Sequence, residues 1–360
     1  MPRPLPHLFL LFLLSFLVAF SKNPWRFFEH RYEYKLSDVI DADRFVKRNG
    51  YWEAYRGKKL VGYVLFSKDW TPKLVGYSGK HMETLIGIDT EGNITGVKLI
   101  YHSEPIVLIG LSEKQYHEFL KQYKGKSIKG ELRVGKEISM DVITGATVTA
   151  VVQNSIIVNS ARMLAESLGI LKARTATRRR RIKRTYERLS WDQLLKMGAV
   201  KRVRITGRDL GLESDDLYLD LYFGVMDPPS VGRNVLRDSV YRRAMEEGAS
   251  FVLLIFSTGG KVSFKGKGFA RGGIFDGFNI EQAGVTHIFR ETDYRIITRK
   301  ELKINEITTF KEGGLFFVRS DRIDPAREFL LNLIVPFRMD GEKKVRNFSV
   351  PYRIPGRFLE

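Results

Sequence analysis

The sequence predicts an α+β protein with about two domains. Runs rich in β-branched and aromatic residues are mixed with helical repeats, in no regular β-α-β alternation. The chain has 360 residues, of which 43% are hydrophobic and 28% are charged. At about 150 residues per domain, this length allows two domains that each bury a core.

The chain begins with a short apolar run. Arg3 precedes it, Leu8–Phe20 is apolar except for one serine, and Ala19 and Ser21 form a small-x-small pattern. A spanning helix needs about 20 apolar residues, whereas a secretory signal core needs about 7–15. A buried core helix is the poorer explanation for such a run after a basic start. We therefore expect residues 1–21 to be a signal peptide or membrane anchor, and the remainder to be extracytoplasmic.

Residues 36–170 are expected to form the first domain. Glycine turns and apolar periodicity predict its elements. These are a strand after Lys58, a hairpin of Thr84–Asp89 and Thr95–His102, a helix capped by Ser112 that stops at Gly125, and a long helix that ends near Gly169.

Residues 171–189 are expected to be a basic linker. Between Arg174 and Arg188 there are eight Lys/Arg and one Glu, so about +7 of the net charge of +19 lies there. We favour a solvated connector, with a contact to anionic lipid head groups as the next alternative. Nucleic acid is the least favoured partner, because an exported protein meets no genome.

Residues 190–360 are expected to form a second, strand-rich domain. The helix SVYRRAMEEG, closed by Gly248, interrupts the strand predictions. The predicted strands are LYLDLYFGV, GLFFVRS and FLLNLIVPFRM, and FVLLIFSTGGKVSFKG is predicted to be a hairpin around Thr258–Gly260.

The composition excludes several cofactor classes. With no cysteine, the chain holds no disulfide, iron–sulfur cluster or zinc-thiolate site. The six histidines, at positions 7, 30, 81, 102, 117 and 287, form no HExxH or other close pair, so we expect no metal site. GKGFARGG at Gly266 departs from GxGxxG and is better explained as a glycine-rich turn.

Hydroxyl side chains crowd the start of the long helix. One helix needs one N-cap, yet four candidates surround a Gly-Ala pair at this point. Exposed amides and the positive end of the helix dipole favour a phosphate there. The residues concerned are Asp141, Thr144, Gly145, Ala146, Thr147 and Thr149.

The stretch DVITGATVT resembles the flavinylation motif Asp-x-x-Ser/Thr-Gly-Ala-Thr-x-Ser/Thr. That motif belongs to the FMN-binding domains of the Rnf-complex G subunit, the sodium-pumping NADH:quinone reductase C subunit and the NosR/NirI proteins. Upstream, DADRF, GYSGK and HSEPIVLIG resemble NosR segments. Downstream, PSVGRNVL, VSFKGKGFARGGIFD and PYRIPGRFL resemble the second extracytoplasmic portion of NosR. The chain is thus similar to the NosR/NirI family from about Asp41 to its end.

This resemblance implies a covalent flavin. In that family the threonine after alanine is joined to the FMN phosphate by a phosphoester, and the matching residue is Thr147. Its neighbours in the motif would orient the turn or serve the flavin transferase, which uses FAD and a divalent metal. The next candidates for flavin contacts are Tyr77, Ser78, His102 and Glu104, although Tyr77 also suits a core and His102 a strand end.

The resemblance further implies an electron-transfer component and not a stand-alone catalyst. It would support the activity or maturation of nitrous oxide reductase or a related respiratory reductase. NosR-type proteins continue into membrane helices and a cysteine-rich ferredoxin-like part after the equivalent of Leu359. We therefore expect a separate membrane electron donor with such clusters, or a shortened version of the family. The alternative is a non-redox sensor or assembly factor that uses the FMN-type domain as a scaffold.

Overall fold

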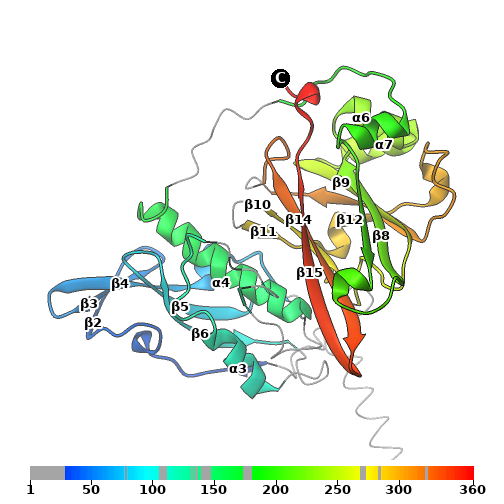
Figure 1. Ribbon diagram of the computed structural model, residues 1–360. Coiled ribbons are helices and arrows are strands. Elements are labelled where there is room, and N and C mark those ends of the chain that lie inside the picture. Colours follow the sequence, from blue (N-terminus) through cyan, green and yellow to red (C-terminus); the bar gives the residue numbers. More distant parts are fainter. Residues whose placement is uncertain are drawn as a thin grey trace, which may run out of the picture.

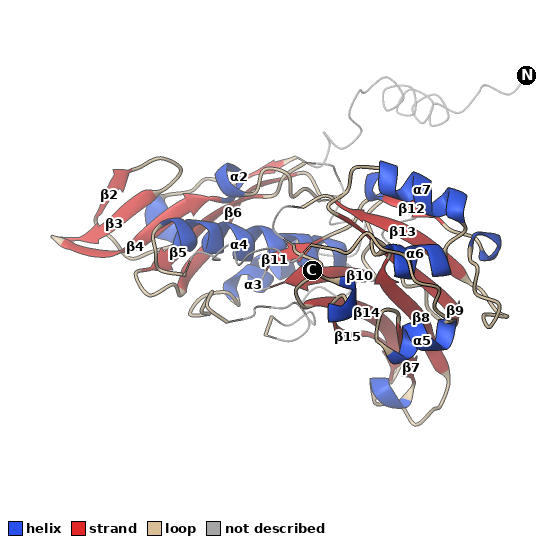
Figure 2. Cartoon of the chain, turned by 90° about the horizontal axis from the view of Figure 1, so that it is seen from above, coloured by secondary structure: helices blue, strands red, loops and turns tan. Residues whose placement is uncertain are grey.

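The computed structural model describes residues 29–76, 78, 80–104, 112–130, 132, 134, 137–138, 147–172, 181–267, 273–282, 285–320 and 323–360. Within these ranges the chain has the predicted α+β fold, with three antiparallel sheets in two regions (Figures 1 and 2). The expected signal peptide or anchor, residues 1–21, lies outside them. Among the described helices, none has both the length and the apolar character needed to cross a bilayer.

The first region is built on a six-stranded antiparallel sheet of order β1-β6-β5-β4-β3-β2. The predicted hairpin is confirmed as β5 and β6, and Gly92 in its turn has a φ of +86° that favours glycine. The strand predicted after Lys58 is confirmed as β4. The strands are β1 His30–Arg31, β2 Arg44–Lys47, β3 Trp52–Arg56, β4 Lys59–Phe66, β5 Glu83–Asp89 and β6 Ile94–His102.

Three helices accompany this sheet: α2 Ser67–Trp70, α3 Glu113–Lys121 and α4 Thr147–Ser167. The predicted cap of α3 is confirmed, because Ser112 and Gln115 form a reciprocal capping box. Every side chain of α4 from Thr149 to Ala161 is buried. A helix buried on all sides needs neighbours on all sides, and α4 has the first sheet on one side and the second region on the other (Figure 1).

The second region contains two sheets. One has the order β12-β13-β9-β8-β7, and the other has the order β11-β10-β14-β15. Their strands are β7 Lys201–Thr206, β8 Leu217–Val225, β9 Phe251–Gly259, β10 Phe278–Gln282, β11 Val285–His287, β12 Tyr294–Ile296, β13 Glu312–Val318, β14 Phe329–Met339 and β15 Glu342–Tyr352. The helices are α5 Trp191–Lys196, α6 Pro229–Val235 and α7 Asp238–Glu246. Short 3₁₀ turns lie at Leu36–Asp38, Arg208–Leu210, Glu291–Asp293, Arg299–Glu301 and Gly356–Phe358.

The predicted hairpin around Thr258–Gly260 is wrong. β9 is the central strand of its sheet, paired with β8 on one side and β13 on the other. After Gly260 the chain follows β8, because the amides of Lys261 and Val262 donate to the carbonyls of Leu217 and Tyr218. The glycines therefore end a strand whose partners lie elsewhere in the sequence.

The two regions share an interface. Ile274 and Ile334 of the second region pack into the core of the first. The Asn347 side-chain amide donates to the carbonyl of Val134, and a polar cavity of about 90 Å³ lies between α4 and the β10–β14–β15 sheet. The N-terminal part of α4 therefore lies against both regions.

Candidate functional site

The predicted phosphate-binding turn is described only from α4 onward. α4 begins at Thr147, and its first turn contains no acidic residue. Tyr77, Asp141, Thr144, Gly145 and Ala146 lie outside the described residues, as does the side chain of Thr147. The structure therefore tests this prediction only through the backbone of α4 from Thr147 and through the side chains from Thr149 onward.

The carboxylate of Glu104 joins the loop after α2 to the first turn of α4. Its Oε1 accepts hydrogen bonds from the Ser78 amide at 3.1 Å and the Ser78 hydroxyl at 3.0 Å, and its Oε2 accepts one from the Thr149 hydroxyl at 3.4 Å. All three side chains are buried. These donors replace the water that a carboxylate loses on burial. The fold thus brings together three residues that the sequence singled out from distant segments.

Gly76 allows this approach. A Cβ added to Gly76 would lie 2.3 Å from Glu104 Oε1, so any other residue would displace the carboxylate. The Gly76 amide donates to the Lys80 carbonyl at 3.0 Å, which closes the turn that presents Ser78. A glycine is therefore required here by space and not by an unusual backbone angle.

Arg290, from the second region, reaches the same loop. Its Nη2 donates to the carbonyl of Val75 at 2.7 Å. Burial lowers the pKa of Arg290, while the charges of Asp293 and Glu104 act in the opposite direction. The guanidinium therefore places a positive charge beside the loop that carries Gly76 and Ser78. Sequence reasoning missed Arg290, since no motif surrounds it and its position depends on contact between the two regions.

His102 belongs to a neighbouring cluster and does not join the Ser78–Thr149 contacts. Its Nδ1 accepts a hydrogen bond from the Glu104 amide at 3.2 Å, and its Nε2 lies 3.2 Å from Tyr32 Oη. Burial lowers the pKa of His102 to about 4, against the attraction of the Glu113 carboxylate. The imidazole is therefore neutral near pH 7 and packs at the end of β6.

The buried face of α4 carries a chain of hydrogen bonds. The Tyr116 hydroxyl donates to Gln153 Oε1 at 2.7 Å, and Gln153 Nε2 donates to the Thr84 hydroxyl at 2.8 Å. Further along, the Thr71 and Ser160 hydroxyls lie 2.8 Å apart. The helical stripe predicted from the sequence included mostly apolar residues, so this polar interior was not anticipated.

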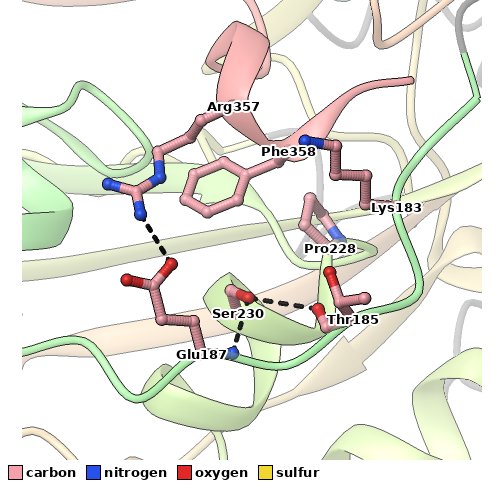
Figure 3. A pocket seen from close by; sticks show the side chains of 7 residues that line it. All are labelled: Lys183, Thr185, Glu187, Pro228, Ser230, Arg357 and Phe358. Atoms are coloured by element: carbon pink, nitrogen blue, oxygen red, sulfur yellow. Dashed lines mark hydrogen bonds and ion pairs between the residues drawn. The ribbon is translucent and has the colours of Figure 1, made fainter.

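A second cavity, of about 350 Å³, lies away from this site in the second region (Figure 3). Its polar side chains join segments that are distant in the sequence. Arg357 pairs with Glu187 at 2.6 Å, and the Ser230 hydroxyl accepts a hydrogen bond from the Glu187 amide and donates one to the Thr185 carbonyl. Main-chain bonds between Arg181 and Glu360 hold the same segments together. This cavity is therefore a seam between the C-terminal residues and the segment that precedes α5.

The comparisons with known proteins identify the first region. Residues 76–159 match the FMN-binding domain family. The chain is 31% identical over 336 residues to "Regulatory protein NosR" of Stutzerimonas stutzeri, covering 85% of this chain and 45% of that protein. This chain belongs to the NosR/NirI family. The NosR of Pseudomonas aeruginosa is 29% identical over 333 residues, 85% of this chain and 46% of that protein. "Protein NirI" of Paracoccus denitrificans is 28% identical over 297 residues, 77% of this chain and 42% of that protein. The chain thus spans about half the length of these NosR and NirI proteins.

The FMN-binding domain contains the predicted flavin residues. Its matched range, 76–159, starts at the glycine that contacts Glu104 and ends within α4. The Ser78–Glu104–Thr149 contacts therefore lie inside the matched range, whereas Arg290 is supplied from outside it. The roles of the individual residues toward FMN stay predictions.

Proposed function

We propose that this NosR/NirI-family chain is an extracytoplasmic flavoprotein that carries FMN on Thr147 through a phosphoester. It would transfer electrons in support of nitrous oxide reductase or a related respiratory reductase. We further propose that residues 36–170 form the flavin domain, 171–189 a basic linker and 190–360 a NosR-like C-terminal extracytoplasmic domain. A flavin transferase, a membrane electron donor with ferredoxin-like clusters and the reductase are the proposed partners.

The start of α4 carries this proposal. A phosphate at Thr147 would meet the free amides and the positive dipole end of a 21-residue helix, with no carboxylate in its first turn. The Glu104 carboxylate fixes that turn to the Ser78 loop, and Gly76 leaves the room that this contact requires. The residues present therefore fit a phosphate-linked cofactor.

The bound flavin would supply the redox chemistry, and the protein would position it. In the attachment step the Thr147 hydroxyl would lose its proton, and its Oγ1 would replace AMP on the flavin-side phosphorus of FAD, so that Thr147 would hold the FMN. Glu104 would hold the Ser78 loop against the first turn of α4. Arg290 would add a positive charge from the second region, which favours extra negative charge on a nearby flavin.

The first experiment tests attachment. The full chain, co-expressed with its flavin transferase, should gain the mass of one FMN less one water, and the modified tryptic peptide should contain Thr147. Thr147→Ala should lose the flavin completely, whereas Thr149→Ser, which keeps the hydroxyl that contacts Glu104, should retain it. Intact mass also reports cleavage within the first residues. Wild-type protein that remains free of flavin in the presence of an active transferase would refute the attachment.

The second experiment separates electron transfer from the alternative role as a non-redox sensor or assembly factor. The size of the second region, which carries no assigned chemistry, favours that alternative. Cells that depend on this gene should lose reductase activity when Thr147→Ala replaces the wild type, with equal protein levels in the extracytoplasmic fraction. Unchanged reductase activity in the flavin-free variant would support the scaffold role instead.

A further inference from the structure

Three of the six histidines of the chain converge on one carboxylate. Glu113 Oε1 lies 3.6 Å from His30 Nδ1 and 3.5 Å from His102 Nε2, and Glu113 Oε2 lies 4.0 Å from His117 Nε2. We name these four residues the histidine cluster. It is distinct from the Ser78–Glu104–Thr149 contacts and has no part in the proposed attachment of flavin.

Strand register creates the cluster. His30 and His102 are direct partners in the antiparallel pairing of β1 with β6, and their rings stack at 4.9 Å with an interplanar angle of 8°. α3 begins beside this pair and supplies Glu113 and, one turn later, His117. Sequence spacing could not reveal this set, because 72 positions separate the two paired histidines.

The spacing of the atoms suits a small divalent ion. In a tetrahedral site with metal–ligand distances of about 2.0–2.1 Å, neighbouring ligand atoms lie about 3.3–3.4 Å apart. The two His–Glu separations, 3.5 and 3.6 Å, are close to this value, and one ligand atom from each of His30, His102 and Glu113 lies within 4.8 Å of the other two. The His30 and His102 rings stack with an interplanar angle of 8°, so their in-plane lone pairs point in nearly parallel planes. One ring must therefore rotate before both nitrogens and Glu113 can reach one ion.

Within the described part of the chain, one oxygen of Glu113 has no hydrogen-bond partner with good geometry, although His102 Nε2 faces it at 3.5 Å. Among the described residues, Glu113 Oε1 is buried and accepts no hydrogen bond, while the Tyr32 hydroxyl donates to Oε2. A buried carboxylate oxygen without a donor costs free energy. Hydrogen bonding inside the cluster therefore leaves this oxygen, which faces both imidazoles, unsatisfied.

We propose that His30, His102 and Glu113 bind a divalent transition-metal ion of the Zn²⁺ class. Two imidazoles and a carboxylate, without thiolate, favour Zn²⁺ and its neighbours over Ca²⁺ and Mg²⁺, which prefer all-oxygen sites. His117 Nε2 lies 4.0 Å from Glu113 Oε2 and Tyr32 Oη lies 3.2 Å from His102 Nε2, so both side chains border the proposed site.

Binding has a structural cost that limits affinity. The Glu104 amide now donates to His102 Nδ1, so the ring proton of the neutral imidazole is on Nε2. An ion bound at Nε2 takes the place of that proton, and the neutral ring then carries its proton on Nδ1. Because Nδ1 can no longer accept, the 3.2 Å hydrogen bond from the Glu104 amide is lost. Metal binding therefore releases a main-chain contact two residues away, and we expect the affinity to be moderate for a three-ligand site.

The experiment is a calorimetric Zn²⁺ titration of the untagged full chain at pH 7.5. Wild type should bind one ion, and His30→Gln and Glu113→Gln should each weaken binding by at least about tenfold. Both side chains are partly exposed, so these variants should fold. Glu118→Gln, an exposed substitution on the same helix, is the matched control and should bind as wild type. All proteins are compared at equal flavin content, so that the flavin phosphate cannot account for a difference.

A thermal readout complements the titration. Saturating Zn²⁺ should raise the melting temperature of wild type and Glu118→Gln, and leave Glu113→Gln unchanged. The same concentration of Mg²⁺ should shift none of them. Absence of Zn²⁺ binding by wild type, or equal Zn²⁺ affinity in wild type and Glu113→Gln, would overturn the proposal.

Discussion

The two regions differ in what they bury. Along α4 the first region buries a series of polar side chains, namely Thr149, Gln153, Asn154, Ser155, Asn159 and Ser160. The second region instead buries clustered aromatic rings, among them Phe256, Phe264, Phe275, Phe278, Phe289 and Phe316. Both interiors are dense, but the packing around α4 depends more on hydrogen-bond partners at fixed positions than the aromatic packing does.

This difference indicates that the first region positions the side chains of a site, whereas the second region acts mainly as a supporting structure. The polar interior lies next to the predicted flavin residues, and its hydrogen bonds fix side-chain positions as well as contributing to stability. The aromatic interior supports the two sheets of the second region, and Arg290 of this region reaches the loop that carries Gly76 and Ser78. Substitutions should therefore affect stability most in the second region and positional order most in the first.

The largest expected effect is the removal of an aromatic ring from the second region. Phe316 is fully buried, and its ring centroid lies 4.8 Å from that of Phe278 and 4.9 Å from that of Phe275. Phe316→Ala should lower the free energy of unfolding by about 3–5 kcal/mol, because it removes packing and leaves a cavity. Urea unfolding followed by tryptophan fluorescence measures this change.

Ile296→Ala is the control for Phe316→Ala. Ile296 lies on the strand that pairs with the Phe316 strand but is 61% exposed. It should change stability by less than about 0.5 kcal/mol. Equal losses in the two variants would contradict the view that ring packing stabilises this region.

The second effect concerns Asp227, a carboxyl group of the second region for which the effect of burial outweighs the attraction of Arg184. Burial raises the pKa of Asp227 to about 7, although its Oδ2 accepts a hydrogen bond from the Val252 amide at 2.8 Å. A raised pKa means that the folded state keeps the proton longer than the unfolded state. The contribution of Asp227 is therefore fully present below about pH 4 and is lost as the pH rises to about 7. At pH 8 Asp227→Asn should therefore have a free energy of unfolding higher than that of wild type by roughly 1–3 kcal/mol. This range already allows for the part of the side chain that reaches solvent.

Asp220→Asn provides the opposite case, on the strand that precedes Asp227. Asp220 pairs with Arg202 at 2.7 Å, and this contact lowers its pKa. Its substitution should destabilise the protein at pH 8 and have little effect at pH 3, where the unfolded carboxyl is protonated. Thermal melts of both variants at pH 3 and pH 8 check these signs, and a loss of stability in Asp227→Asn at pH 8 would contradict the argument.

Local signals in the sequence predicted local structure. The Glu91-Gly92-Asn93 turn indicated the β5–β6 hairpin, and Ser112 marked the start of α3, because each feature depends on residues within one turn. The hairpin at Thr258–Gly260 failed for the opposite reason. β9 pairs with strands that lie far away in the sequence, and a glycine pair carries no information about them.

The site shows the same limit. Thr149 was found from the hydroxyls at the start of the long helix, Ser78 and Glu104 were found through the family resemblance, and the fold brings the three together. Arg290 and the histidine cluster were not found, because one depends on contact between regions and the other on the register of β1 with β6. No spacing rule encodes either arrangement.

The smallest effect we predict tests the polar interior directly. Tyr116→Phe leaves Gln153 Oε1 without the donor that now lies at 2.7 Å, so the free energy of unfolding should fall by about 1–2 kcal/mol. Adding Gln153→Leu removes the stranded acceptor. The double variant should therefore lose less than the sum of the two single variants, with a coupling of about 1 kcal/mol in urea titrations.

Tyr352→Phe supplies the comparison from the second region. The Tyr352 hydroxyl is also buried, but its partners are the Val225 amide at 3.0 Å and the Ala199 carbonyl at 2.9 Å. No second side-chain substitution can remove those backbone groups. The loss of unfolding free energy in Tyr352→Phe should therefore not be recovered by a second substitution. If Tyr116→Phe with Gln153→Leu loses the full sum instead, the hydrogen bonds of α4 act independently. The first region would then differ from the second in composition alone and not in the cooperation of its buried groups.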